Sequence, residues 1–235
     1  MTPYASGKRW TLYHGDSVTH APSLPKSGWL ISDPPYGVNL NTAFASAGRS
    51  NACAANDYAP VEGDDRPFDP SPWLQWPRLV LFGANYYADR LPASGCWLVW
   101  DKRDGVCTND QADAELAWVR GTTGTVPRIF RHVWMGMVKA SERSERRVHP
   151  TQKPVAPMRW VLDTVGAPGD GLVVDPYSGS GSTGVAAVES GRSFIGVELS
   201  TAYLDIAARR LAQAENDGVP LSLFAPSTLS TEAAK

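Results

Sequence analysis

Cysteine is scarce in this sequence. The 235 residues include only Cys53, Cys96 and Cys107, and they form no CxxC pair. An odd, scattered set is typical of reduced thiols and excludes a disulfide framework or a cysteine-based metal site. No apolar run approaches the roughly 18 residues of a membrane span, and residues 1–10 lack the apolar core of a signal peptide. The sequence therefore predicts a cytoplasmic protein whose partners include neither a membrane nor a metal.

An excess of one charge is also missing, since 22 basic and 24 acidic residues give a net charge of −2. The distribution is nevertheless uneven. Residues 120–160 hold nine Lys or Arg and two acidic residues, which gives +7 there and leaves −9 on the rest. A basic patch on an acidic body suits contact with a polyanion through one face, and a solvated basic surface is the alternative. Charge alone does not decide between them.

The apolar pattern predicts a single α/β domain. Hydrophobic residues make up 43% and charged residues 20%, as in ordinary globular proteins, and no solenoid-length repeat is present. Short apolar runs alternate with helical spacing toward the C-terminus, which predicts a mostly parallel sheet covered on both faces. Strands are expected within 10–18, 29–37, 78–83, 96–102, 126–137, 171–175 and 193–199, and helices within 158–165, 182–191 and 200–215. Residues 1–215 would form the domain and 216–235 a weakly ordered tail.

A glycine loop follows the expected strand at 171–175. Residues 179–184 read Gly-Ser-Gly-Ser-Thr-Gly, and Glu198 ends the next strand nineteen residues after Gly179. Glycines let the backbone approach a ligand, and an acid at this distance can accept hydrogen bonds from both ribose hydroxyls. The pattern indicates a ribose-bearing cofactor at the carboxyl edge of the sheet. A tight strand–helix turn without a ligand is the structural alternative.

The acid before the glycines selects among such cofactors. Asp175 precedes Pro176 at the tip of the first strand, where a negative charge would repel a pyrophosphate and attract an ammonium. S-adenosylmethionine has a ribose and an amino group but no phosphate, so it fits better than a dinucleotide. An NAD-dependent oxidoreductase remains a remote alternative that explains only the glycine loop and Glu198.

A second motif, Asp33-Pro34-Pro35-Tyr36, ends the expected strand at 29–37. Proline fixes φ and removes a donor, so the pair makes a stiff turn. This turn can present the Asp33 carboxylate and the Pro34 carbonyl as two acceptors for one NH₂ group, with the Tyr36 ring as a stacking surface. These hydrogen bonds would aim the nitrogen lone pair at a methyl donor, and the base would have to leave the duplex to reach them. A rigid loop turn is the alternative interpretation.

Four segments together resemble the DNA amino-methyltransferases that use S-adenosylmethionine, specifically their circularly permuted β class. They are GDS (15–17), DPPYG (33–37), HPTQKP (149–154) and DPYSGSGSTG (175–184) followed by FIGVEL (194–199). The catalytic motif precedes the cofactor motif, as in that class. The resemblance implies a single Rossmann-like methyltransferase domain with a mostly parallel, doubly wound sheet.

The resemblance also implies roles for individual residues. Catalysis would fall to Asp33, Pro34, Pro35 and Tyr36. The cofactor would contact Asp16, Thr151, Lys153, Asp175, Tyr177, Ser178, Gly179, Ser180, Gly181, Glu198 and Leu199. Among these, Asp16 would meet the adenine amino group and Lys153 the methionine carboxylate. His149 is interpreted as a structural or surface residue. Tyr177 and Ser182 stand where the family more often has Phe and Thr.

Little chain is left for target recognition beyond residues 38–72, expected to form a long mobile loop, and 104–148. We expect Arg128, Arg131, Arg143, Arg146 and Arg147 to contact DNA phosphates or bases. A small recognition region favours a short or relaxed site and a stand-alone enzyme, either monomeric or homodimeric. DPPY is commoner among adenine-N6 enzymes of this family, so adenine is the expected target. Cytosine-N4 is the close alternative, and an inactive DNA-binding module is a further one.

Overall fold

The computed structural model describes residues 1–40, 42, 60–105, 112–135, 138–142 and 148–217. Within them nine strands form one sheet in the order β1-β2-β11-β10-β3-β4-β6-β5-β7, and β8 and β9 form a separate hairpin. In sheet order the strands are β1 (Ala5–Ser6), β2 (Trp10–His14), β11 (Ser193–Glu198), β10 (Leu172–Asp175), β3 (Trp29–Ser32), β4 (Leu79–Phe82), β6 (Ala114–Arg120), β5 (Trp97–Asp101) and β7 (Arg128–Arg131). The hairpin strands are β8 (Trp134–Met135) and β9 (Val138–Lys139).

Five neighbouring strands, β2, β11, β10, β3 and β4, run parallel to one another. Strand β6 runs antiparallel between β4 and β5, and β7 is parallel to β5. This arrangement confirms the predicted Rossmann-like α/β fold. It also places β10, late in the sequence, directly beside the early strand β3, so the two sequence motifs that follow these strands meet at one edge.

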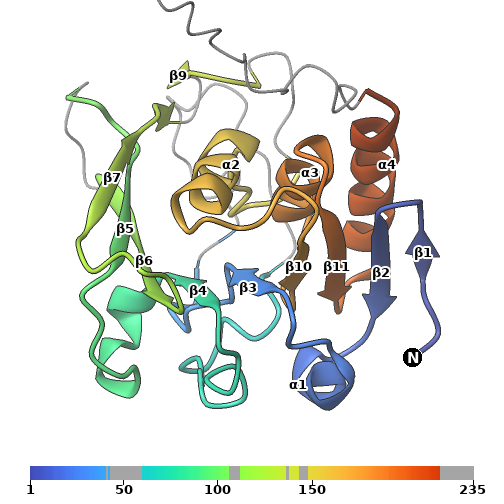
Figure 1. The fold of residues 1–235 in the computed structure, drawn as a ribbon, viewed down its shortest axis with the longest axis horizontal. Coiled ribbons are helices and arrows are strands. Elements are labelled where there is room, and N and C mark those ends of the chain that lie inside the picture. The colour runs from blue at the N-terminus through green and yellow to red at the C-terminus, as the bar shows by residue number, and fades with distance from the viewer. Residues whose placement is uncertain (41, 43–59, 106–111, 136–137, 143–147, 218–235) are drawn as a thin grey trace, which may run out of the picture.

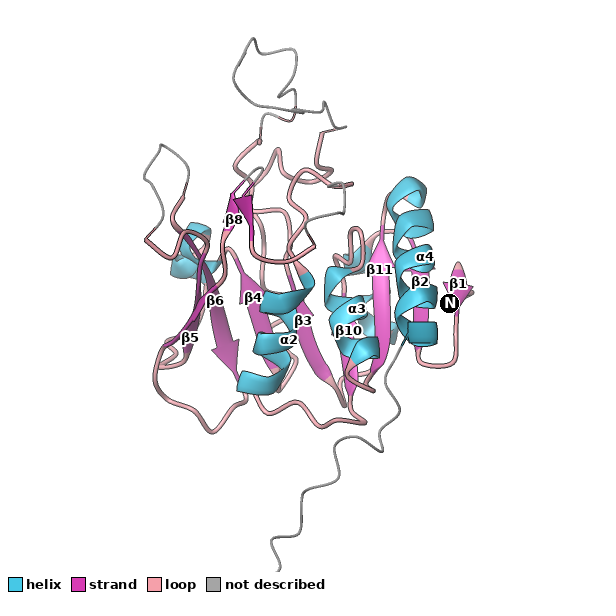
Figure 2. Cartoon of the chain, turned by 90° about the horizontal axis from the view of Figure 1, so that it is seen from above, coloured by secondary structure: helices cyan, strands magenta, loops and turns pink. Residues whose placement is uncertain are grey.

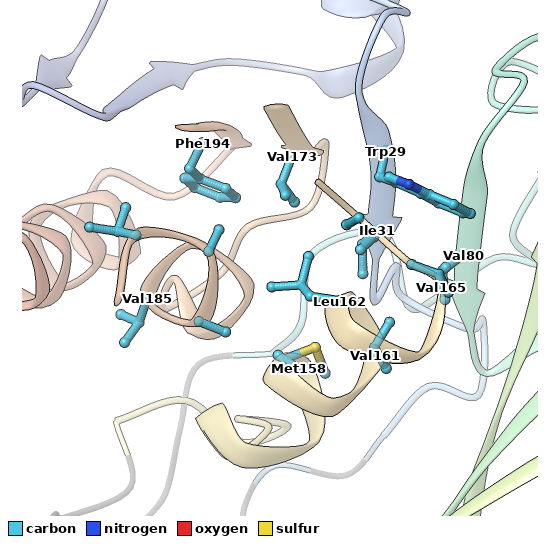
Figure 3. Close-up of a cluster of buried hydrophobic side chains, with 14 of the residues drawn as sticks. Trp29, Ile31, Val80, Met158, Val161, Leu162, Val165, Val173, Val185 and Phe194 are labelled. Carbon is cyan, nitrogen blue, oxygen red and sulfur yellow. The ribbon is translucent and has the colours of Figure 1, made fainter. Parts of the chain in front are cut away.

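Three helices cover one face of the sheet: α2 (Val155–Thr164), α3 (Ser182–Glu189) and α4 (Thr201–Asp217). They lie side by side across the strands in Figures 1 and 2. The spacing of Met158, Val161, Leu162 and Val165 predicted the α2 helix, and these side chains belong to one buried cluster with Trp29, Ile31 and Val80. In Figure 3, Leu162 lies near Ile31 and Val165 near Val80. The predicted tail boundary at 216 falls inside α4, which continues to Asp217.

The opposite face is covered by shorter elements. These are α1 (Ser17–His20), η1 (Ala21–Ser23), η2 (Ala84–Tyr86), η3 (Ala88–Arg90) and the turns of residues 60–77. Phe68, Trp73 and Trp76 are buried there against Leu30 and Leu79. The end of the segment expected to be a long mobile loop therefore contributes Phe68 to the core. Burying aromatic side chains of this size contributes on the order of 2 kcal/mol or more each.

Candidate active site

One cavity of about 620 Å³ opens where β2, β11, β10 and β3 end. Its size is in the range typical of small-molecule sites. Nearly every residue predicted for catalysis or cofactor binding lines it, Gly181 excepted. The predicted lining residues are Asp16, Asp33, Pro34, Pro35, Tyr36, Thr151, Lys153, Asp175, Tyr177, Ser178, Gly179, Ser180, Glu198 and Leu199. His149, interpreted as a structural or surface residue, also lines it and lies with its ring centroid 4.3 Å from that of Tyr203.

The DPPYG turn is held by a residue that the sequence did not indicate. The buried carboxylate of Asp64 accepts hydrogen bonds from the backbone N–H groups of Gly37 (2.9 Å), Val38 (3.2 Å) and Leu40 (2.7 Å). Gly37 has φ of +80°, and a Cβ there would collide with the carbonyl oxygen of Arg66. The turn is therefore fixed by both proline stiffness and a carboxylate that satisfies three donors.

The Tyr36 ring is positioned by its neighbours at the end of β4. Gly83 has φ of +67°, and a Cβ at this position would overlap the Tyr36 ring. Tyr86 stacks on Tyr36 with ring centroids 5.2 Å apart and stays 54% exposed at the cavity. Offset aromatic stacking of this kind is favourable. The motif predicted a stacking role for Tyr36 but did not indicate its two partners.

Asp33 lies in a cluster of alternating charges. Its carboxylate accepts from the Tyr36 hydroxyl and pairs with the Lys153 ammonium. Lys153 also pairs with Glu115 at 2.9 Å, and Glu115 with Lys102 at 3.0 Å. Burial raises the pKa of Asp33, Lys153 opposes this, and Glu115 adds to it. Lys153 thus lines the cavity, and its ammonium pairs with two protein carboxylates.

The glycine loop is hydrogen-bonded to the Glu198 carboxylate. The backbone N–H of Gly179 donates to Glu198 Oε2 at 2.8 Å, and that of Ser200 donates to Oε1 at 2.8 Å. Gly179 and Gly181 have φ of +49° and +84°, which explains two of the glycines. The third, Gly184, allows α3 to pack on β11, since a Cβ there would lie 2.6 Å from the Phe194 ring.

Asp175 is buried at the centre of the site. Its Oδ1 accepts from Ser32 Oγ at 2.6 Å and from the Tyr177 backbone N–H at 3.1 Å. Burial raises the pKa of Asp175 from its ordinary value of 3.8 to about 6, despite these hydrogen bonds. Burial also raises the pKa of Glu198, which accepts a hydrogen bond from the glycine loop. Two desolvated carboxylates at one cavity are what a ligand with an ammonium and hydroxyl groups would satisfy.

The cavity also contains an unsatisfied polar atom. Among the described residues, the buried Ser178 Oγ has no hydrogen-bond partner. Buried polar groups are normally paired, so this hydroxyl still has the capacity for a hydrogen bond. Ser178, the glycine backbone and the two carboxylates together fit a nucleoside bearing an amino acid. Asp16, which caps α1 by accepting from the Thr19 N–H at 2.8 Å, lines the same cavity.

The predicted DNA contacts lie partly outside the described residues, since Arg143, Arg146 and Arg147 are not among them. Arg128 and Arg131 lie at the two ends of β7, on the edge of the sheet. Arg131 is at the carboxyl end, which faces the same way as the end of β3, and its side chain is 58% exposed. It lies 3.7 Å from Asp101 and 3.8 Å from Asp104, so its charge is partly compensated.

The described part of the chain contains neither a membrane-spanning helix nor a cluster of metal ligands. No helix there is long and apolar enough to cross a membrane. No group of three or more His, Cys, Asp or Glu side chains among the described residues is arranged to hold a metal ion. Cys96 is the one cysteine that the structure describes, and it is a buried free thiol.

Solved structures share this fold. The cytosine-N4-specific PvuII DNA methyltransferase superposes with a TM-score of 0.59 over 91% of this chain and 94% of its own, at 15% identity. The complex of M1.HpyAVI with SAM superposes with a TM-score of 0.53 over 86% of this chain and 98% of its own, at 19% identity. A putative DNA modification methylase from Thermus thermophilus superposes with a TM-score of 0.52 over 86% of this chain and 94% of its own, at 18% identity. The chain therefore has the Rossmann-like α/β fold that these DNA methyltransferase structures share.

Sequence comparison finds similarity over parts of the chain. A family model described as DNA methylase, of the N6/N4 methyltransferases, matches residues 105–209. DNA adenine methyltransferase YhdJ of Escherichia coli K12 is 46% identical over 63 residues, 27% of this chain and 21% of YhdJ. Putative methylase YubD from the same organism is 45% identical over 69 residues, 29% and 30% of the two chains. The matched segments thus span less than a third of either relative.

Proposed function

We propose that this protein is a DNA methyltransferase that moves a methyl group from S-adenosylmethionine to the exocyclic N6 of a flipped-out adenine. One observation carries the proposal: Asp33, Pro34 and Tyr36 line the same cavity as the glycine loop. This follows from the parallel pairing of β3 with β10, which brings the ends of the two strands together. An acceptor pair for an amino group therefore adjoins a site suited to a sulfonium nucleoside.

The cofactor site is argued from charge and hydrogen-bonding capacity. Asp175 would hold the ammonium, and the orphaned Ser178 hydroxyl would meet a polar group of the methionine part. Each oxygen of Glu198 already accepts one backbone hydrogen bond and has a second acceptor position for a ribose hydroxyl. Asp16 and Leu199 would contact the adenine. Bound S-adenosylmethionine would supply a methyl group on a sulfonium cation.

The target base would be oriented by the DPPY turn. A carboxylate and a carbonyl on a stiff turn can accept the two N–H groups of one amino nitrogen, which aims its lone pair at the methyl carbon. In the transfer, the nitrogen pair would form the new C–N bond and the C–S pair would return to sulfur. The methylated nitrogen would then release one proton to water, and the Asp33 carboxylate beside it would stabilise the positive charge until that proton leaves. Positioning of the two reactants is the main contribution of the protein.

Adenine is favoured as the target because the matched segment of YhdJ, an adenine methyltransferase, is 46% identical. DPPY is also the commoner form among adenine enzymes of the resembling class. For DNA, Arg128 and Arg131 on β7 would contribute phosphate contacts at the edge of the sheet. Because contacts to phosphates release counterions, we expect binding to weaken as the salt concentration rises.

The test is the base composition of DNA from a host that lacks DNA methylation. The protein and its Asp33→Ala variant are expressed there, and the hydrolysed DNA is analysed by mass spectrometry. N6-methyladenine with the protein and none with the variant is expected. N4-methylcytosine would overturn the choice of base and keep the mechanism. The absence of both modified bases, with a folded protein present, would overturn the proposal.

A binding measurement separates catalysis from cofactor recognition. Asp33 lies on the side of the cavity formed by the DPPY turn, so Asp33→Ala should keep most of the affinity for S-adenosylmethionine while transfer is abolished. Titration calorimetry on both proteins checks this. Retained turnover in the variant would contradict the role given to Asp33.

A further inference from the structure

Four charged side chains near the cavity form a continuous chain of ion pairs. Lys153, 6% exposed, contacts Asp33 on one side and Glu115 on the other, the latter at 2.9 Å. Lys102 closes the chain at 3.0 Å from Glu115. The Lys153 ammonium also donates to the Tyr36 hydroxyl at 3.1 Å. These groups come from separate elements, since Asp33 follows β3, Glu115 lies on β6, Lys102 follows β5 and Lys153 precedes α2.

An arrangement of this kind is costly unless every charge is compensated. A buried ion loses its hydration. If one member of a buried ion pair is removed, the other is left as an unpaired charge. Here the alternation of signs compensates both carboxylates. Burial favours neutral Glu115, but Lys153 and Lys102 outweigh burial and lower its pKa to about 2. Burial likewise opposes the charge of Lys153, while Asp33 and Glu115 raise its pKa. Both groups are therefore charged at neutral pH.

We propose that Glu115 is a positioning residue for methyl transfer: by sharing the Lys153 ammonium with Asp33, it fixes the Asp33 carboxylate and keeps Lys153 from neutralising it. The inference rests on the proposed function. The ion pairs of Glu115 are with Lys153 and Lys102, so it acts on the DPPY turn through Lys153. Its position on β6 places it two strands from β3 in the sheet.

Glu115 would influence Asp33 because it changes the number of carboxylates that face Lys153. The four groups are neutral together, since Lys102 balances Glu115 at the far end of the chain. Lys153 lies between two carboxylates, so its attraction is divided between them, and Asp33 can still accept an N–H and stabilise positive charge on the methylated nitrogen. Without Glu115, Lys153 would pair with Asp33 alone. The pair would then be neutral overall, and Asp33 would be a poorer acceptor at the moment when the nitrogen becomes positive.

The charged and titratable groups that face Asp33 come from several elements. Tyr36 and Lys153 touch it directly, and Glu115 acts on it from β6. Asp175 at the end of β10 and Tyr87 after η2 also experience its charge, since burial and then Asp33 raise the pKa of both. Among these neighbours, Glu115 can be altered without touching the turn or the cofactor loop.

The experiment compares Glu115→Gln and Glu115→Asp with the unchanged protein. Glu189→Gln is the matched control, because it breaks an ion pair with Arg159 between α2 and α3. The pKa of Asp33 is followed by carboxyl ¹³C NMR in the cofactor-free protein, with its signal assigned from Asp33→Asn. Transfer is followed as kcat, KM for DNA and the pH dependence of kcat. Thermal unfolding checks that each variant is folded.

Glu115→Gln should lower the pKa of Asp33 by at least about half a unit, since it removes a like charge from the neighbourhood. It should lower kcat about tenfold, with KM for DNA and cofactor affinity nearly unchanged. The acid limb of the kcat profile should move to lower pH with the pKa of Asp33. Glu115→Asp, which keeps the charge, should restore part of kcat and most of the pKa. Glu189→Gln should change neither quantity.

Two outcomes would overturn the inference. One is a pKa of Asp33 that is the same in the Glu115→Gln variant as in the unchanged protein, which the NMR titration reveals even if no substrate is methylated. The other is equal loss of kcat in both Glu115 variants at an unshifted pKa, which indicates packing and not charge. Absence of methyl transfer by the unchanged protein would instead contradict the proposed function, so the two failures are distinguishable.

Discussion

The ring of Tyr36 lies stacked on the ring of Tyr86, with centroids 5.2 Å apart and planes inclined by 15°. Tyr86 thus occupies a face of the ring on which, in the proposed function, the target base would stack. A base that takes this face must first displace Tyr86. The exposed position of Tyr86 on η2 gives its side chain room to leave.

Tyr86→Ala should therefore ease entry of the target base. The lost stack is worth about 0.5–1.5 kcal/mol, which corresponds to about a two- to tenfold lower KM for DNA. Fluorescence of a 2-aminopurine at the target position should rise correspondingly. Tyr86→Phe keeps the stack and should behave like the unchanged protein. A higher KM in the alanine variant would mean that Tyr86 supports the bound base.

Gly83→Ala should lower kcat in addition to lowering the unfolding free energy. Ala at φ of +67° costs about 1–2 kcal/mol in the left-handed region, and its methyl group would also displace the Tyr36 ring. We expect a loss of unfolding free energy of at least this size and at least a roughly tenfold fall in kcat.

Gly166→Ala provides the matched control for Gly83. Gly166 has φ of +68°, and no atom lies within 4 Å of a Cβ built there. This variant should have the same backbone cost while keeping kcat. Urea unfolding and initial rates on both variants separate the two effects, and equal rates in both would rule out a role for close Gly83–Tyr36 packing.

Sequence patterns located the two motifs because their positions follow from local rules. A stiff Pro-Pro turn and a glycine loop each end a buried strand, and ends of parallel strands share an edge. That β3 and β10 are neighbours is a finding of the structure, seen in the register Val173–Trp29 and Val174–Leu30. Thus Asp33, Asp175 and Glu198 converge on one cavity as expected.

The residues that hold these motifs in place could not be predicted from local sequence patterns. Glu115 reaches Lys153 only because β6 inserts antiparallel between β4 and β5, a pairing that no short motif specifies. Asp64 supports the DPPYG turn from 27 residues beyond Gly37. The resemblance placed Lys153 at the cofactor but did not indicate its ion pair with Glu115. Such long-range partners follow from tertiary packing and not from local spacing.

Arg210→Met should weaken cofactor binding through the glycine loop. Arg210 Nη1 donates to the Ser180 carbonyl oxygen at 2.7 Å and to Ser182 Oγ at 3.2 Å, and Nη2 lies 3.4 Å from Glu142 Oε1. Hydrogen bonds from a charged donor contribute about 1.5–3 kcal/mol, so affinity for S-adenosylmethionine should fall about tenfold or more. Calorimetry measures this fall.

Arg209→Met is the control for that substitution. Arg209 is on the same helix but donates to the Asp205 carbonyl oxygen within it, at 3.2 Å. The Arg209→Met substitution removes one positive charge from α4, as Arg210→Met does, but leaves the hydrogen bonds to the glycine loop in place. The cofactor affinity of this variant should therefore match that of the unchanged protein. A similar loss in both variants would attribute the effect to net charge.

The buried carboxyl of Asp175 should make stability depend on pH. Its pKa of about 6 lies above the ordinary 3.8, so the folded protein binds the proton more tightly than the unfolded chain. Stability from this group is therefore full below pH 3.8 and is lost as pH rises to about 6, by about 3 kcal/mol. Asp175→Asn should be more stable than the unchanged protein at about pH 8, with the difference shrinking toward about pH 4. Urea unfolding across this range tests it.

Cofactor affinity should depend on the same group in the opposite sense. A protonated Asp175 has no charge for the ammonium, so affinity for S-adenosylmethionine should fall as pH drops through about 6. A bound ammonium favours the charged carboxylate, so binding near pH 6 should also release protons, visible as buffer-dependent heats in calorimetry. Asp175→Asn should bind weakly at every pH and show neither effect. An affinity in the unchanged protein that stays constant between about pH 5 and 8 would contradict the contact between Asp175 and the ammonium, because the proton and the ammonium compete for one carboxylate.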